Sequence, residues 1–387
     1  MLNNQPSVRA IAFYLPQYHP IPENDVWWGK GFTEWTNVTK AKPLFSGHYQ
    51  PHLPADLGFY DLRLPEARES QAELAREYGI HGFCYYHYWF NGRRILERPF
   101  NEVLTSGKPD FPFCLCWANE NWTRAWDGNE KNVLLEQKYS EEDDRHHIRS
   151  LVNAFRDERY IRIDGKPLFL VYRASIIPDP LKTTSIWREE AHKLGLGEFY
   201  LCKVESNFSG ERIDPEKLGF DAAIEFQPDC NHGCPKLRRN RFWRLLRRSK
   251  LADKSYEVNN IFDYAKLVEN MSQKQPVEYK RFPCVTPSWD NTARRSTGAV
   301  VFRDSTPELY EQWLVQAIKK IPTSNPDERI VFINAWNEWG EGCHLEPCQK
   351  WGRDYLEATR RVLLEADSNT LSTESKFQVI SLQNVKG

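Results

Sequence analysis

Short runs of β-branched and aromatic residues alternate with helix-like stretches along the whole chain, and this alternation restricts the possible folds more than any other feature. It is typical of a parallel sheet whose strands are joined by crossover helices. Eight runs read as strands, over residues 9–18, 82–89, 111–118, 167–173, 199–205, 222–227, 282–289 and 330–336. Helical stretches follow most of them, for example over residues 64–78, 143–156, 185–194, 307–321 and 355–366.

Eight strand–helix units predict an α/β fold of the (β/α)8 TIM barrel type, with enlarged loops after the strands. A doubly wound open sheet is the alternative, but that fold places a glycine-rich phosphate-binding turn after its first strand. Here the first run ends in Leu15-Pro16-Gln17-Tyr18-His19-Pro20. We therefore expect one catalytic barrel domain over residues 1–366, followed by a polar, turn-rich and loosely ordered tail over residues 367–387.

One connection is too long for an ordinary loop. Between strands six and seven, about residues 229–279 form an insertion, and the stretch from Lys236 to Lys250 within it carries eight Lys or Arg residues and no acid. Phe242, Leu245 and Leu246 recur there at helical spacing, which predicts a short basic amphipathic helix. Two interpretations stay open: contact with anionic lipid or a charged glycan, and a solvated basic face.

The charge balance and the cysteines bear on what the protein binds and on the compartment in which it works. The chain has 52 Lys+Arg against 53 Asp+Glu, which argues against a free-standing nucleic-acid binder. Residues 1–9 lack the basic-then-apolar pattern of a signal peptide. Nine cysteines, an odd number spread through strand-like segments, indicate reduced core thiols rather than a disulfide framework. Together these features predict a cytoplasmic protein.

Polar and aromatic residues follow the predicted strands, which is where a barrel of this type carries its chemistry. Flat apolar faces with a polar edge suit sugar rings, so we expect these residues to bind carbohydrate. The candidates are Tyr18, His19, Trp35, His87, Tyr88, Trp117, Asn119, Glu120, Trp122, Trp289, Asp290, Trp336 and Asn337, with Arg294 as a weaker one. The long first loop, residues 20–61, contains Trp35 and is expected to form a lid or wall.

The strongest chemical feature is a pair of carboxylates, Glu338 and Glu341, at the end of the last strand. On a tight turn, positions i and i+3 bring side chains within about 5–6 Å, the carboxylate separation of a retaining glycosidase. The flanking Trp336 and Trp339 are expected to raise the pKa of one carboxyl, so that one acts as acid and the other as base. The alternative is an acidic turn that only caps the barrel.

Glu120 offers a second way to build such a pair. A large class of barrel glycosidases presents its acid in an Asn-Glu pair at a strand end, and that scheme would pair Glu120 with Glu338. That class uses strands four and seven, whereas these residues follow strands three and eight. We therefore assign Glu120 to the binding of sugar hydroxyls.

The segment Cys230-Asn231-His232-Gly233-Cys234 offers three possible metal ligands in five residues. A structural zinc site needs a further pair of ligands at matching spacing, and the sequence has none. We expect no metal and no cofactor.

Four motifs resemble those of the WbsX-type group, which is related to glycoside hydrolase family 99. They are Ala12-Phe13-Tyr14-Leu15-Pro16-Gln17-Tyr18-His19, Trp27-Trp28-Gly29-Lys30-Gly31-Phe32-Thr33-Glu34-Trp35, Trp117-Ala118-Asn119-Glu120-Asn121-Trp122 and Trp336-Asn337-Glu338-Trp339-Gly340-Glu341-Gly342. The resemblance spans about residues 9–365. It implies a (β/α)8 barrel that acts without a metal on α-mannosidic bonds within glycan chains. It also implies that Glu338 is the base and Glu341 the acid/base.

These observations predict a carbohydrate-active enzyme. We expect a retaining, endo-α-mannosidase-like glycoside hydrolase that cleaves an α-linked glycan in O-antigen or capsule metabolism, because WbsX-type genes lie in such clusters. A glycosyltransferase of lipopolysaccharide or O-antigen biosynthesis is the alternative, and a non-catalytic glycan-binding protein is the third. The expected partner is an oligosaccharide or polysaccharide, with contact to the inner face of the cell membrane or to a lipid-linked glycan through the basic stretch from Lys236 to Lys250.

Overall fold

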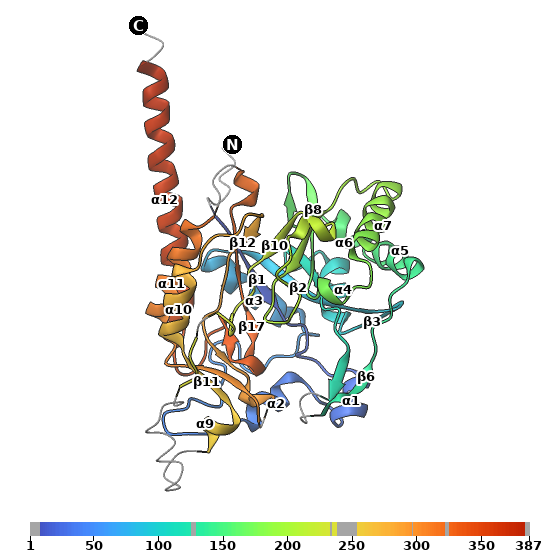
Figure 1. The fold of residues 1–387 in the computed structure, drawn as a ribbon, viewed down its shortest axis with the longest axis vertical. Helices are drawn as coiled ribbons and strands as arrows, with labels where there is room; N and C mark the ends of the chain where they lie inside the picture. The colour runs from blue at the N-terminus through green and yellow to red at the C-terminus, as the bar shows by residue number, and fades with distance from the viewer. Residues whose placement is uncertain are drawn as a thin grey trace.

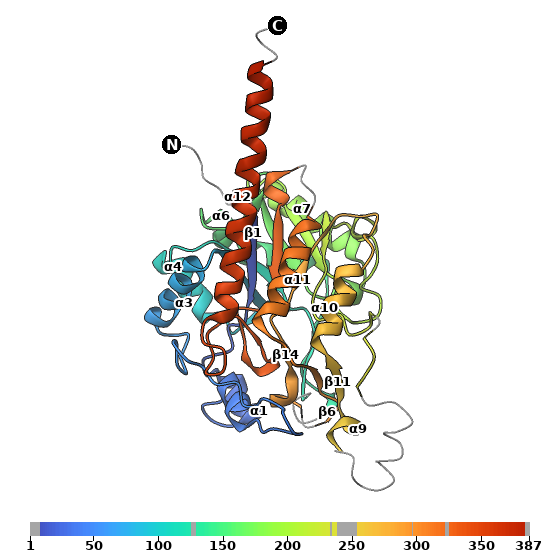
Figure 2. The same cartoon turned by 90° about the vertical axis from the view of Figure 1, so that its left-hand side faces the viewer.

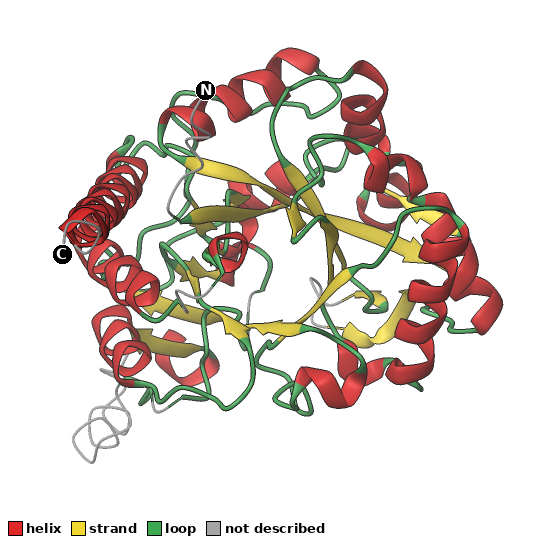
Figure 3. Ribbon diagram, turned by 90° about the horizontal axis from the view of Figure 1, so that it is seen from above, coloured by secondary structure: helices red, strands yellow, loops and turns green. Residues whose placement is uncertain are grey.

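The alternating pattern of the sequence folds into a parallel barrel surrounded by helices, which Figure 3 shows from above. The computed structural model describes residues 8–383 apart from 125–128, 233, 238–253, 296 and 322–324. The barrel strands are β1 (Arg9–Tyr14), β2 (Ile80–Phe90), β4 (Phe113–Trp117), β8 (Lys166–Val171), β9 (Tyr200–Val204), β10 (Ala222–Ile224), β12 (Arg281–Phe282), β13 (Cys284–Val285) and β16 (Ile330–Ile333). The pairing order is β12-β10-β9-β8-β4-β2-β1-β16-β13.

The barrel closes through two short strands on either side of one proline. β12 pairs with β10, and β13 pairs with β16. Pro283 between them has no N–H to donate to a ladder, but its carbonyl accepts a hydrogen bond from the Phe332 N–H at 2.9 Å. β12 and β13 therefore share the seventh of eight barrel positions, which confirms the predicted (β/α)8 TIM barrel.

The strands are buried on both faces, as expected where one face fills the barrel and the other packs on helices. β1, β4 and β16 are buried along their whole length. The surrounding helices include α3 (Pro65–Glu77), α4 (Arg98–Ser106), α5 (Glu141–Ser150), α6 (Val152–Arg156), α7 (Pro180–Lys193), α10 (Tyr264–Gln273), α11 (Pro307–Lys319) and α12 (Asp354–Gln383). No helix within the described ranges combines the length and apolarity that crossing a membrane requires.

The last helix is longer than the sequence pattern predicts. We expected a helix over residues 355–366 and then a turn-rich tail, but α12 continues to Gln383 and extends past the barrel in Figures 1 and 2. The segment after Asp367 contains Ser, Thr and Asn residues, which favour turns. It has no Gly or Pro before Gly387, so nothing in it breaks the helix. The expectation of turns was wrong for this reason.

The loops after the barrel strands carry the remaining elements, and they gather at the end of the barrel opposite the free end of α12 (Figure 1). These are α1 (Pro22–Trp28), α2 (Glu34–Lys40), the hairpin β5 (Trp122–Arg124) and β6 (Asn129–Leu135), and the small sheet of β11 (Asn260–Asp263), β14 (Trp289–Asp290) and β15 (Val300–Arg303). The loops therefore form a mouth over the carboxyl ends of the strands.

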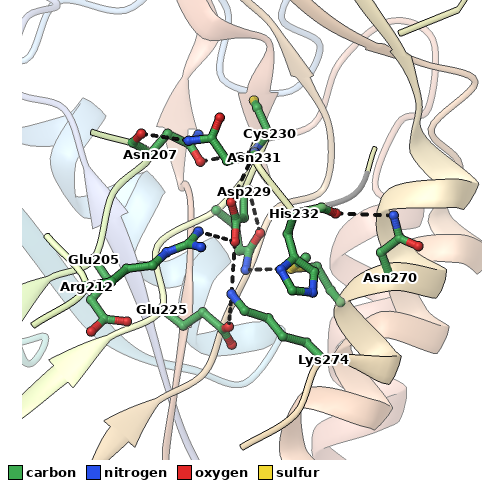
Figure 4. Close-up of polar contacts among 12 residues, drawn as sticks. Glu205, Asn207, Arg212, Glu225, Asp229, Cys230, Asn231, His232, Asn270 and Lys274 are labelled. Carbon is green, nitrogen blue, oxygen red and sulfur yellow. Dashed lines mark hydrogen bonds and ion pairs between the residues drawn. The ribbon is translucent and has the colours of Figure 1, made fainter. Parts of the chain in front are cut away.

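The insertion between strands six and seven is attached to the barrel by buried ion pairs, which Figure 4 shows. Asp229 lies between Arg212 and Lys274, with Lys274 Nζ 2.9 Å from its carboxylate. Lys274 also pairs with Glu225 at 2.6 Å. The basic amphipathic helix predicted around Phe242, Leu245 and Leu246 lies outside the described residues.

Candidate active site

A cavity of about 740 Å³ opens at the mouth of the barrel. Its size is within the range of small-molecule sites in enzymes. All eight barrel positions contribute charged or aromatic side chains to its wall, from the loops after the strands or, for Tyr86 and Tyr88, from the end of β2 itself. The charged residues that line it are Glu120, Arg173, Arg294, Arg295, Glu338 and Glu341.

Both predicted catalytic carboxylates line this cavity, and a tight turn after β16 places them there. Glu338 ends the short strand β17 (Asn337–Glu338), and Glu341 ends the 3-10 helix η6 (Trp339–Glu341) that follows. Gly342 then adopts φ +60°, and a Cβ at this residue would lie 3.0 Å from the Asp290 carbonyl oxygen. Glycine is therefore required for the chain to turn back into β18 (Cys343–His344), which pairs with β17.

One guanidinium holds the two carboxylates together. Arg294 Nη2 lies 2.9 Å from an oxygen of Glu338, and its Nη1 lies 2.9 Å from an oxygen of Glu341. The third edge of the guanidinium, at Nε, is 2.8 Å from Glu34. Arg294 therefore joins three carboxylates from two distant parts of the chain, the first loop and the turn after β16.

The electrostatics of this cluster favour a retained proton. Three carboxylates surround one cation, and the side chains of Glu34 and Glu338 are 0% and 7% exposed. Burial raises the pKa of Glu338 to about 8, against the opposing effect of Arg294 and with a further rise from Glu341 and Glu34. Burial also raises the pKa of Glu341, while Arg294 lowers it. The buried cluster is thus built to keep a proton near neutral pH.

A second cluster of opposite charges lies on another part of the cavity wall. Arg173 Nη1 is 2.6 Å from Glu120, and its Nε is 2.8 Å from the fully buried Glu211. The Glu120 side chain is 39% exposed. The guanidinium also lies 3.9 Å from the ring centroid of Phe208, which is partly exposed at the cavity. Arg173 thus presents a carboxylate and an aromatic ring to whatever occupies the cavity.

Aromatic side chains form a further part of the wall. Trp122 packs edge-to-face on Tyr88, with ring centroids 5.2 Å apart, and on Trp27 at 5.7 Å. Trp28 on α1 lines the cavity as well, so the first loop does form part of the wall. Of the predicted sugar-binding residues, Tyr88, Glu120, Trp122 and the weaker candidate Arg294 line the cavity.

Four predicted residues lie behind the cavity and hold the turn that carries Glu338 and Glu341 in place. The Tyr18 hydroxyl donates to the Asn337 carbonyl at 2.7 Å and accepts from the Trp339 N–H at 3.1 Å. The Asn337 side chain accepts from the Leu15 N–H at 2.7 Å, which ties the turn to the end of β1. Trp35 packs against Trp339 with centroids 5.6 Å apart, and Trp336 is fully buried. These side chains position the carboxylates and do not line the cavity.

The other predicted residues are also buried away from the cavity lining or lie beside it. His87 contacts His147 on α5, and Trp117 packs against the same His147 from the helix side of the barrel. Asn119 bonds both the N–H and the carbonyl of Arg173, so it fixes the backbone that carries the second cluster. His19 bonds the Pro16 carbonyl, Asp290 pairs with His48 at 2.6 Å, and Trp289 is partly buried in β14.

Several residues of the site were missed. Tyr86 and Tyr172 line the cavity although neither was a candidate, and Arg173 and Glu34 were not considered for it. For Tyr86 the signal was available, because side chains alternate across a strand and Tyr86 has the same parity as Tyr88. For Glu34 the sequence gives one indication: an acidic residue stands between the aromatic residues Phe32 and Trp35, in a segment whose aromatic side chains favour burial.

The five-residue segment of possible metal ligands does not converge. Figure 4 shows the Cys230 side chain pointing away from the His232 ring. The Cys234 sulfur instead accepts a hydrogen bond from the Asn270 side chain at 3.6 Å. Among the described residues, no three His, Cys, Asp or Glu side chains are grouped as metal ligands. All nine cysteines lie in the described ranges and are free thiols.

The comparison with protein families is specific over almost the whole chain. A family model described as glycosyltransferase WbsX matches residues 10–359. The chain belongs to the WbsX family. Two WxcX proteins from strains of Xanthomonas campestris pv. campestris are each 44% identical to it over 357 residues. These residues are 92% of the chain and 50% of each relative, so this WbsX-family chain spans half the length of those proteins.

Solved structures share the fold of this WbsX-family protein. The endo-alpha-mannosidase of glycoside hydrolase family 99 from Bacteroides thetaiotaomicron superposes with a TM-score of 0.55 and 16% identity, over 93% of this chain and 98% of that one. A glycoside hydrolase-like protein gives a TM-score of 0.56 with 14% identity, over 94% and 96%. These likenesses establish the barrel fold, and the matched family is described as one of glycosyltransferases, which are carbohydrate-active enzymes.

Proposed function

We propose that this chain cleaves an α-linked glycan with retention of configuration and that Glu338 and Glu341 carry the reaction. The observation that supports this most is the position of both carboxylates on one guanidinium in a cavity with aromatic walls. Paired carboxylates with a raised proton affinity are what glycoside cleavage requires, because one proton must reach the leaving oxygen.

The roles within the pair follow the resemblance to glycoside hydrolase family 99. Glu338 takes the proton of the sugar 2-hydroxyl, whose oxygen attacks C1 to form a 1,2-anhydro sugar. Glu341 donates its proton to the leaving oxygen. Water then opens the three-membered ring at C1, with its proton returning to Glu341, while Glu338 gives its proton back to O2.

Burial and basicity in the structure are consistent with these roles. The Glu341 side chain is 25% exposed and that of Glu338 only 7%, so Glu341 is the more accessible to a leaving group and to water. A pKa near 8 makes the Glu338 carboxylate a strong base for its class, which suits the removal of a proton from a weakly acidic hydroxyl. The same value means that Glu338 has to lose its proton before it can act.

Binding of the sugar chain is assigned to the rest of the cavity wall. Tyr88 and Trp122 present rings on which pyranose faces can stack. Glu120 presents a carboxylate that is fixed by Arg173 and can accept hydrogen bonds from sugar hydroxyls. We propose that these three residues contact the glycan directly.

Glycosyl transfer is the second candidate, and the name of the matched family favours it. The same carboxylate pair can transfer the sugar to an acceptor hydroxyl in place of water, with Glu341 as the base for that hydroxyl. The two activities differ in what the cavity binds. A hydrolase is stabilised by oligosaccharides, whereas a transferase that uses an activated donor is stabilised by that donor.

Thermal-shift measurements separate the two candidates. The protein is screened against α-linked oligosaccharides and against a set of nucleotide sugars, with Glu341→Gln as the matched inactive variant. We expect stabilisation by an oligosaccharide and none by nucleotide sugars. Strong stabilisation by one nucleotide sugar, with no response to oligosaccharides, would rank transfer first.

We also propose that the enzyme works in the cytoplasm on surface polysaccharide or its lipid-linked precursor. The support is the free state of the cysteines and the basic sequence from Lys236 to Lys250. Vesicles of anionic and of neutral lipid test the membrane part. Sedimentation of the chain with anionic vesicles, lost when Arg244, Arg247 and Arg248 become Glu, is expected; equal sedimentation of the variant would reject the contact.

A further inference from the structure

Glu34 is a fully buried carboxylate that belongs to the catalytic cluster without lining the cavity. One of its oxygens accepts from Arg294 Nε at 2.8 Å and from the Asn37 side chain at 3.3 Å. Its other oxygen is buried and has no hydrogen-bond partner among the residues that the structure describes. Burying a carboxylate in this way costs free energy, and the contacts with Arg294 and Asn37 offset part of that cost.

The contact of Glu34 with Arg294 fixes how the guanidinium is presented to the cavity. A guanidinium is planar, and its donors form a rigid fork. With Nε held by Glu34, the two terminal nitrogens face Glu338 and Glu341 and bind one oxygen of each at 2.9 Å. The Glu34 carboxylate also offsets part of the Arg294 charge, which would otherwise act on the catalytic pair alone.

From this geometry we infer that Glu34 is a positioning residue, which acts through Arg294 to orient the Glu338–Glu341 pair and is coupled to the charge of that pair. The inference rests on the proposed function for its consequence in catalysis. Its physical content, a coupling between Glu34 and the protonation of Glu338, does not require any substrate.

The glycine inside the catalytic turn supports this role. A Cβ at Gly340 would collide with the Glu34 carboxylate and would lie 2.8 Å from Arg294 Nε. The φ angle of Gly340 is not in the left-handed region, so the backbone itself would accept alanine. The missing side chain therefore serves the Glu34–Arg294 contact rather than the path of the chain.

Other groups that act on the pair come from every side of the cavity. Within the described part of the chain they are Tyr18 after β1, Tyr86 and Tyr88 on β2, Glu120 after β4, Tyr172 after β8, Arg294 and Arg295 after η4 (Asn291–Ala293), and Cys343 on β18. Burial raises the pKa of each of these tyrosines and of Cys343, so they stay neutral near pH 7. Removing the charge of Glu34 therefore leaves the two arginines and Glu120 as the charged neighbours of the pair.

The test is a carbon-13 NMR titration of the glutamate carboxyls in the substrate-free full chain, with the Glu338 signal assigned by its loss in Glu338→Gln. Glu34→Gln keeps an oxygen that accepts from Arg294 Nε but removes the charge. We expect the Glu338 midpoint to fall by about one pH unit, the size of effect of a like charge at close range. Gly340→Ala, which pushes the carboxylate away, is expected to shift it in the same direction.

The matched control is Glu211→Gln, which removes an equally buried carboxylate from Arg173 and is expected to leave the Glu338 midpoint unchanged. An unchanged midpoint in Glu34→Gln, with the fold intact by circular dichroism, would overturn the inference. So would an equal shift in Glu211→Gln. If the titration behaves as expected but Glu338→Gln retains full turnover, the proposed function fails and the coupling stands.

Discussion

Two guanidinium–carboxylate clusters line the cavity, and they differ in stoichiometry and in burial. Arg294 binds three carboxylates, of which Glu34 and Glu338 are almost completely buried. Arg173 binds two, and one of them, Glu120, is 39% exposed. The same types of side chain thus form a cluster that retains a proton around Arg294 and a cluster with better balanced charges around Arg173. The two clusters differ in this way because the Arg294 cluster is more deeply buried and has three carboxylates on one arginine, whereas the Arg173 cluster has two.

The difference assigns separate tasks to the two clusters. Burial raises the pKa of Glu338 to about 8 and also raises that of Glu120, which Arg173 lowers. A carboxyl that holds its proton near neutral pH can exchange it with a sugar oxygen. A partly exposed carboxylate fixed by an arginine is suited to accept hydrogen bonds from hydroxyls. We therefore expect variants of the first cluster to lose turnover and variants of the second to lose affinity.

The largest expected effect is on turnover. Glu338→Gln and Glu341→Gln should each lower kcat by about 10²–10⁴-fold, because each removes a proton transfer from the reaction. Glu120→Gln is the matched variant of the second cluster and should change KM more than kcat. Rates on a glycan substrate and its binding by calorimetry check this. A kcat loss in Glu120→Gln as large as in Glu338→Gln would erase the distinction between the clusters.

The next effect is on stability. Arg294→Gln removes the cation that contacts all three carboxylates, two of which are buried, and should lower the free energy of unfolding by about 3–5 kcal/mol at pH 8. Arg173→Gln leaves one buried and one partly exposed carboxylate, so its loss should be smaller. Urea unfolding followed by circular dichroism measures both. Equal losses in the two variants would mean that the number of carboxylates on the arginine does not determine how much stability is lost.

A smaller effect is on the pH dependence of stability. The pKa of Glu338 is raised in the folded state to about 8, from about 4.3 in an unfolded chain. Between these values the unfolded state has released a proton that the folded state keeps, so the contribution of Glu338 to stability falls as pH rises from about 5 to 8. Glu338→Gln lacks this dependence. Its Tm should therefore rise relative to that of the unchanged protein across this range.

Thermal denaturation at several pH values checks this prediction, with Glu120→Gln as the comparison from the second cluster. A Tm difference between Glu338→Gln and the unchanged chain that stays constant from pH 5 to 8 would show that Glu338 ionises in the folded state as it does in the unfolded one.

The smallest expected effect concerns the aromatic edge of the second cluster. Phe208→Ala removes the ring on which Arg173 stacks, and Phe208 is partly exposed at the cavity. An exposed cation–π contact is worth about 0.5–1 kcal/mol. We expect KM to rise by about two- to fivefold with kcat unchanged. Steady-state kinetics measure this. A fall in kcat with KM unchanged would mean that Phe208 acts in the reaction step and not in substrate binding.

Much of the fold could be predicted from the sequence because strand burial leaves a direct pattern. All eight predicted runs contain barrel strands, although most of the runs extend past the paired residues into the loops. The pattern of residues 282–289 predicts one strand, but Pro283 divides it into β12 and β13, and its end belongs to the separate strand β14. A proline within an apolar run does not show by itself that the short strands before and after it occupy the same position in the barrel.

The site could be predicted less completely, because composition does not give the direction of a side chain. The sequence pattern predicts that both His87 and Tyr88 bind sugar, yet His87 faces α5 whereas Tyr86 and Tyr88 face the cavity. The partnership of Glu34 with Arg294 joins residues 260 positions apart, and no local spacing encodes it. Tyr18 and Asn337 lie near strand ends as expected but do not line the cavity, and their hydrogen bonds at the turn that carries Glu338 and Glu341 depend on the closed barrel.

The central claim is that Glu338 and Glu341 together break a glycosidic bond with retention. Proton NMR of the first product released from an O-antigen polysaccharide or its lipid-linked precursor tests it most directly, because the anomeric configuration is read before mutarotation. We expect the α-anomer from the unchanged enzyme and from Glu120→Gln at saturating substrate, and release slower by about 10²-fold or more from Glu338→Gln and Glu341→Gln. Release of the β-anomer, or product from Glu338→Gln at the unchanged rate, would contradict the account.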